Sequence, residues 1–119
     1  MARRSATPRL RDIIDAIDRI RSETEGVTLD AFEADWRKRW LVERGTEIIS
    51  EASRHLPADM KARHPEIQWR KVAGVGNVLR HEYERTAPEV LWSLAHEDLP
   101  TLEKVCREEL AAADPAEEE

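Results

Sequence analysis

The middle of the chain reads QWRKVAGVGNVLRHEY over residues 68–83 and carries the pattern of an amphipathic helix. Apolar residues recur there at every third or fourth position, which is the spacing of one helical face. They are Trp69, Val72, Val75, Leu79 and Tyr83. Asn77 and His81 fall on the opposite face, with Arg80 at its margin. We therefore expect the apolar face to contact a core and His81 to point away from it.

The composition of the whole chain favours the same kind of structure. Its 119 residues are enough for one domain with a single modest core. Ala, Leu, Glu and Arg are abundant and Gly numbers only 4, so helices are favoured throughout and no strand is expected. We predict a flexible leader over residues 1–7, a helical domain over residues 8–112 and a disordered acidic tail over residues 113–119.

Helix signals divide the first half of the chain. Pro8 suits a first helical turn, and the helix that follows is expected to end near Gly26. The next periodic segment covers residues 29–56 and is either one long helix or two helices with a break near residues 37–40. Gly45 lies on or near its apolar face, where a missing side chain lets another helix approach closely.

The second half carries equally clear boundaries. Residues 57–65 form a polar connector that begins and ends with proline, and the central helix follows it. Thr86 and Glu89 match a capping box, which predicts the start of a fourth helix. A break at residues 98–100 precedes a last helix. The predicted fold is all-α, an antiparallel bundle of four to five helices.

Charge and cysteine content narrow the functional classes. The net charge of −6 argues against a general nucleic-acid coat or a polybasic membrane binder. Residues 61–85 are nevertheless locally basic, with six Lys or Arg against three Glu, and a phosphate-bearing partner fits that stretch. The single cysteine, Cys106, is expected to be a buried apolar residue in a reducing compartment. No membrane span and no metal-ligand spacing is seen, so we expect a cytoplasmic protein without metal or cofactor.

The central stretch also resembles a known family. It reads RHPEIQWR over residues 63–70 and GVGNVLRHEY over residues 74–83, and both runs are similar to the HepT-like branch of the HEPN (higher eukaryotes and prokaryotes nucleotide-binding) superfamily. Shorter similar runs follow the family's order on both sides, at residues 9–13, 47–52, 90–92 and 98–100. The resemblance covers roughly residues 8–110, which makes it far more specific than a lone motif.

The resemblance implies a fold, an activity and partners. Members are up-and-down helical bundles that form symmetric homodimers, with the motif helices of both subunits lining one cleft. They are metal-independent ribonucleases that act on RNA as the toxin of a toxin–antitoxin pair. The implied partner is a small nucleotidyltransferase that transfers AMP to a tyrosine of the toxin.

The family pattern is an Arg, four residues, a His, any residue and a Tyr. His81 and Tyr83 occupy the His and Tyr positions, and Asn77 matches the polar residue that follows the Arg. By resemblance, His81 is catalytic and Tyr83 accepts AMP. The Arg position is occupied by Gly76, which removes a guanidinium able to bind a phosphate. Arg80, next to His81, is the candidate substitute.

Each of these residues also has an ordinary structural interpretation. His81 and Asn77 are compatible with a solvated helix surface, Arg80 with a surface ion pair and Tyr83 with a core ring whose hydroxyl reaches the surface. Arg70 and Lys71 are less well placed substitutes for the missing Arg, and the pair Glu47 and Glu51 is interpreted as a solvated face. Three functions follow: a ribonuclease with a substitute cation, a dimer that binds RNA, a nucleotide or its nucleotidyltransferase partner without cutting, or a purely structural dimer.

Overall fold

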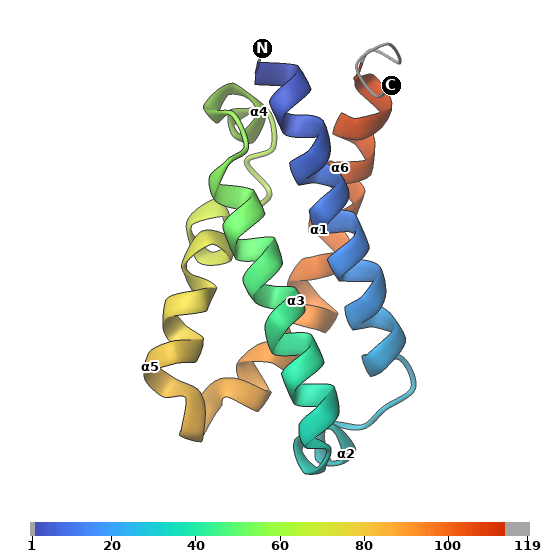
Figure 1. Cartoon of the computed structure of the whole chain (residues 1–119), viewed down its shortest axis with the longest axis vertical. Helices are drawn as coiled ribbons and strands as arrows, with labels where there is room; N and C mark the ends of the chain where they lie inside the picture. Colours follow the sequence, from blue (N-terminus) through green and yellow to red (C-terminus); the bar gives the residue numbers. More distant parts are fainter. Residues whose placement is uncertain (1, 114–119) are drawn as a thin grey trace.

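The computed structural model describes the backbone of residues 2–113 and the side chains of residues 6–76 and 88–113. This part of the chain is helical and contains no strand, as the sequence predicts. The helices are α1 (Ala2–Thr24), α2 (Leu29–Ala34), α3 (Trp36–Arg54), α4 (Ala58–Ala62), α5 (Trp69–Ser93) and α6 (Leu99–Ala112), with a π-helical turn η1 (Leu94–Asp98) before the last. Figure 1 shows α1, α3, α5 and α6 running up and down the long axis, with α2 at the opposite end from the start of α1.

The core lies where α3 packs against α1 and α5, and where α1 packs against α6. Its side chains come from the predicted apolar faces. The most deeply buried include Leu10, Ile13, Ile17, Ile20, Val42, Ile49, Leu91, Leu102 and Cys106. Val72 and Val75 confirm the buried face of the central helix, whereas the side chains of Leu79 and Tyr83 lie outside the described residues. Burial of Cys106 raises the pKa of its thiol to about 12.

Local signals explain the turn and the break in the first half. Gly26 has a φ of +75°, the left-handed conformation expected after the first helix. The segment 29–56 is two helices, and the break falls at Asp35, slightly before the expected position. The cause is a cap, because Asp35 Oδ1 accepts hydrogen bonds from the backbone amides of Arg37 (3.0 Å) and Lys38 (3.2 Å).

Two predicted boundaries are wrong, and both were placed at prolines. Helix α1 begins at Ala2, inside the expected leader, because Ala6 and Thr7 are buried and their turn packs with the rest of the helix. Helix α5 continues through the expected new start at Thr86 to Ser93, with Pro88 inside it. Figure 1 shows α5 bending in its lower part, the usual response of a helix to proline.

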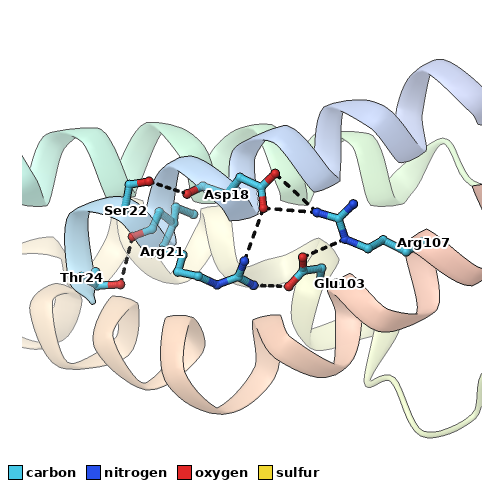
Figure 2. Close-up of polar contacts among 7 residues, drawn as sticks. Asp18, Arg21, Ser22, Thr24, Glu103 and Arg107 are labelled. Atoms are coloured by element: carbon cyan, nitrogen blue, oxygen red, sulfur yellow. Dashed lines mark hydrogen bonds and ion pairs between the residues drawn. The ribbon is translucent and has the colours of Figure 1, made fainter. Parts of the chain in front are cut away.

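An ion-pair network joins α1 to α6 at the surface. Figure 2 shows Asp18 and Arg21 of α1 facing Glu103 and Arg107 of α6. Glu103 accepts hydrogen bonds from Arg21 and from Arg107 Nε, the latter at 2.8 Å, while Asp18 lies 3.4 Å from nitrogens of both arginines. Burial disfavours the ionised form of Glu103, but its bonds to Arg21 and Arg107 outweigh this and lower its pKa. The carboxylate of Glu103 therefore stabilises the packing of α6 against α1.

Gly45 is a point of close approach between α3 and α1. A Cβ added there would lie 2.9 Å from both Cγ1 and Cδ1 of Ile20, a buried side chain. The close helix approach expected at Gly45 is confirmed. Gly74 of α5 differs, because a Cβ added there would meet nothing within 4 Å.

The two glycines predict opposite effects of the same substitution. Gly45→Ala should lower the free energy of unfolding by about 1 kcal/mol, because overpacking against Ile20 exceeds the gain in helix propensity. Gly74→Ala should raise it by about 0.5–1 kcal/mol, because only the propensity gain applies. Urea unfolding followed by circular dichroism measures both, and equal effects of the two substitutions would contradict the packing described for Gly45.

The ion-pair network predicts a pH-dependent contribution to stability. Glu103→Gln should lower the free energy of unfolding by roughly 1 kcal/mol at pH 7, whereas Glu108→Gln, an exposed residue of the same helix, should change it little. Because the folded-state pKa of Glu103 is lowered, its contribution is complete above the unfolded pKa of about 4.3 and is lost as pH falls through the folded value. Thermal melts from pH 7 down to pH 3 should show the gap between wild type and Glu103→Gln closing in acid.

Candidate functional site

The sequence-predicted site residues all lie on α5. Asn77, Arg80, His81 and Tyr83 follow Gly76 within the helical backbone of Trp69–Ser93. Their side chains lie outside the described residues, so their grouping rests on helical spacing, which puts Asn77 and His81 one turn apart. The described side chains show how the first turns of α5 contact the preceding connector, η1 and α3.

The start of α5 is fixed to the connector before it. Trp69 Nε1 donates hydrogen bonds to the carbonyl oxygens of Lys61 (3.0 Å) and His64 (3.2 Å). Val72 and Val75 are buried one turn later and continue the same packed face. Lys71 points to the other side, where its Nζ pairs with Asp98 of η1 at 2.9 Å. Lys71 is therefore tied to η1 and does not join the residues that surround Gly76.

A charged hollow lies beside Gly76. It has a volume of about 230 Å³ and is lined by Gly76 together with five residues from one face of α3. These are Arg44, Glu47, Ser50, Glu51 and Arg54. Their positions recur at helical spacing, so a single face of α3 brings both cations and carboxylates to the turn that precedes Asn77.

Two side chains of the hollow bind the same carbonyl of α5. Ser50 Oγ donates to the carbonyl oxygen of Ala73 at 2.7 Å, and Arg54 Nη2 donates to the same oxygen at 2.8 Å. Ser50 is buried, whereas the Arg54 side chain is 44% exposed. These bonds fix α5 on α3 within one turn of Gly76. The guanidinium of Arg54 thereby sits at the boundary between the helices and solvent.

The carboxylates of the hollow are engaged in ion pairs. Glu51 accepts from His55 Nε2 at 2.9 Å and lies 3.2 Å from Arg54 Nη1. The hydrogen bond with His55 is the main cause of the lowered pKa of Glu51, and the charge of Arg54 adds to it. Glu47 lies 3.7 Å from Arg44. Within the described part of the chain, no group of three or more His, Cys, Asp or Glu is placed to hold a metal ion.

Arg54 and Ser50 are the site residues that sequence reasoning missed. The pair Glu47 and Glu51 was noticed, but only as a solvated face. The charged residues at positions 44, 47, 51 and 54 do recur at helical spacing, which is the signal that predicts a shared face. Nothing in that spacing indicates that the face turns toward Gly76, because this depends on the packing of α3 on α5.

A larger hollow of about 310 Å³ lies elsewhere and contains no residue of α5. It is lined by residues of α1, α4, α6 and their flanks, including Arg63 and Glu109. Glu109 binds Arg63 Nη2 at 2.8 Å and His64 Nε2 at 2.5 Å, so its carboxylate is occupied in holding the connector onto α6. We assign Glu109 a structural role. Among the described helices, none is long and apolar enough to cross a membrane.

Comparison with known proteins identifies the class of this bundle. The family model described as "Ribonuclease HepT-like" matches residues 13–109, which include α5 and its motif. The chain belongs to the HepT-like ribonuclease family. The expected resemblance is therefore confirmed.

Individual relatives agree with the family assignment. The chain is 39% identical over 100 residues to "Probable ribonuclease HepT" of Thermococcus cleftensis, covering 84% of this chain and 91% of the relative. It is 30% identical over 104 residues to a "Putative RNase" of Methanocaldococcus jannaschii, covering 87% and 95%. No solved structure matches the chain.

Proposed function

We propose that this protein is a metal-independent ribonuclease and the toxin of a toxin–antitoxin pair, with a composite site at a homodimer cleft. We further propose that AMP transfer to Tyr83 inhibits it. The observation that carries the proposal is the register of His81 and Tyr83 with the family motif, on a helix held against α3 in a chain of the HepT-like family. The partners are RNA, a second copy of the chain and a nucleotidyltransferase.

The proposed reaction uses the side chains of the motif. RNA cleavage without a metal requires a base for the 2′-hydroxyl, an acid for the leaving oxygen and a cation for the charge on the phosphorus oxygens. An imidazole serves as base or acid near neutral pH, and two-fold symmetry supplies one His81 from each subunit for the two proton transfers. Asn77 is assigned to orient His81 or hold a phosphate oxygen, and Arg80 to provide positive charge.

An exposed apolar patch on α3 supports the homodimer. Trp36, Trp40 and Leu41 are 49%, 59% and 41% exposed, which is unusual for such large apolar side chains. The two indole rings contact each other edge to face with centroids 4.9 Å apart. Tryptophan is enriched at protein interfaces, and α2, next to this patch, contacts α5. We assign the patch to the contact with the second subunit.

Gly76 supports a second candidate function. Without the motif guanidinium, a HepT-like dimer retains the basic stretch and the cleft for binding RNA or its nucleotidyltransferase partner but loses stabilisation of the transition state. RNA cleavage in the presence of EDTA separates this binding module from the ribonuclease, because the binding module does not cut.

His81 should be required for cleavage. We expect the purified protein to cut labelled cellular RNA in the presence of EDTA, and His81→Ala to lower the rate by about a hundredfold to ten-thousandfold, the usual contribution of a general acid or base. His96→Ala, which removes an exposed histidine of η1, is the matched control and should cut at the wild-type rate. Cutting that survives in His81→Ala would contradict the proposal. Cutting that appears only in Gly76→Arg would instead establish the binding module.

Tyr83 should be the site of AMP transfer. With ATP labelled at the α-phosphate and the partner nucleotidyltransferase, the phenolic oxygen attacks the α-phosphorus, AMP becomes bonded to Tyr83 and pyrophosphate leaves. We expect wild type to take up label and Tyr83→Phe to take up none, measured by autoradiography and peptide mass spectrometry. Labelled wild type should lose its cleavage activity, because the added charge and bulk lie beside His81. Equal labelling of Tyr83→Phe would rule out this acceptor.

A further inference from the structure

Arg54 extends from α3 to the turn of α5 that precedes Gly76. Its Nη2 donates to the carbonyl oxygen of Ala73 at 2.8 Å. Side chains on an α-helix lean toward its N-terminus, so a residue at position 76 would cover the turn that contains Ala73. The guanidinium of Arg54 therefore occupies the region that an arginine at position 76 would reach.

Gly76 has no side chain to occupy this region. Gly76, Ser50 and Arg54 line the same hollow of about 230 Å³, and Ser50 donates a 2.7 Å hydrogen bond to the carbonyl oxygen of Ala73. A long side chain at position 76 would compete with Arg54 for this space. The glycine and the arginine are thus complementary, because the absence of one side chain makes room for the other.

Among the described residues, the guanidinium of Arg54 has two hydrogen-bond partners, Ala73 and Glu51. Of its five N–H groups, one binds Ala73 and one points to Glu51, at 3.2 Å from Nη1. The side chain is 44% exposed and lines the hollow, so solvent reaches this guanidinium. Arg44 adds a second cation at the rim. The counter-charges are Glu51, which is shared with His55, and Glu47, which is paired with Arg44.

We propose that Arg54 supplies, from α3, the phosphate-binding guanidinium that the family motif places at the position of Gly76. The ligand is a phosphodiester of the RNA strand, held in the α3–α5 hollow with Arg44 at its edge. This proposal rests on the proposed function in that RNA is the ligand. The proposed function assigns the positive charge at the phosphate to Arg80 alone, whereas this proposal adds a second guanidinium, that of Arg54.

The test measures RNA affinity and cleavage separately. A fluorescent single-stranded RNA oligonucleotide is titrated by anisotropy at several salt concentrations, and its cutting is followed in EDTA. Arg54→Gln should lower the cleavage rate about tenfold to a hundredfold, as expected for loss of a charge-assisted hydrogen bond. It should also reduce the slope of log Kd against log salt by about one, the signature of one lost phosphate contact.

Two control variants distinguish phosphate binding from other roles. Ser50→Ala removes the other bond to Ala73 without changing charge, so it reports the purely structural effect of loosening α3 from α5. Arg19→Gln removes one exposed positive charge of α1 outside the hollow. Arg19→Gln should retain the wild-type salt slope and cutting rate. Ser50→Ala should retain the salt slope because it removes no charge, and any fall in its cutting rate measures the effect of loosening the two helices alone. If Ser50→Ala reproduces the losses of Arg54→Gln, Arg54 is structural and the proposal is overturned.

A swap of positions provides the strongest support. Gly76→Arg combined with Arg54→Gln returns one guanidinium to the hollow, now from α5. This double variant should cut RNA at least tenfold faster than Arg54→Gln alone. If Arg80→Gln abolishes cleavage while Arg54→Gln matches Arg19→Gln in both assays, Arg80 alone is the substitute and the proposal fails.

The outcomes also separate this proposal from the proposed function. A wild type that binds RNA without cutting it contradicts the ribonuclease, and the salt slope of Arg54→Gln then still decides the role of Arg54. Cutting that requires His81 but ignores Arg54 leaves the ribonuclease intact and overturns the proposal. A wild type that neither binds nor cuts RNA overturns both.

Discussion

Helix α3 contacts α1 on one side and α5 on the other, and the fold depends on how closely it approaches both. On the side of α1 the approach is permitted by Gly45, whose missing side chain accommodates Ile20. On the side of α5 the contact is polar, with Ser50 and Arg54 sharing the carbonyl oxygen of Ala73. The first contact fixes the core, and the second fixes the helix that carries the motif. One helix thus couples the stability of the bundle to the position of its candidate site.

The charged face of α3 brings both arginines and carboxylates to the candidate site. A buried hydrogen bond from Ser50 sets the separation of the two helices, while the more exposed Arg54 adds a second bond at their edge. Carboxylates beside it hold the arginines in place and partly neutralise them, which limits non-specific attraction of anions.

The fold was largely predictable because apolar periodicity and turn residues are local. The spacing of Val72 and Val75 and the left-handed Gly26 are properties that neighbouring residues determine. The errors at Pro8 and Pro88 share one cause. Local rules treat proline as a boundary, but both helices continue through their prolines, and the buried side chains of Leu10 and Leu91 follow Pro8 and Pro88 within one turn.

The site was predictable only in part. His81, Asn77 and Tyr83 were predicted because they belong to a short motif on one helix, and with their side chains outside the described residues their roles stay a prediction. Arg54 was not found, because its contact with Ala73 joins residues 19 positions apart through the packing of two helices. Spacing along a sequence specifies which residues share a helical face, but it does not specify which neighbouring helix that face meets.

The burial of Cys106 has a practical consequence for following this protein in solution. The chain has 1 cysteine, and burial raises the pKa of its thiol to about 12, so very little thiolate is present at pH 7. Maleimide dyes and nitroxide spin labels attack the thiolate, so the native chain is nearly inert to them. A cysteine introduced at an exposed position would be the dominant labelling site. Distances between probes on two chains would then be measurable without first removing Cys106 from the core.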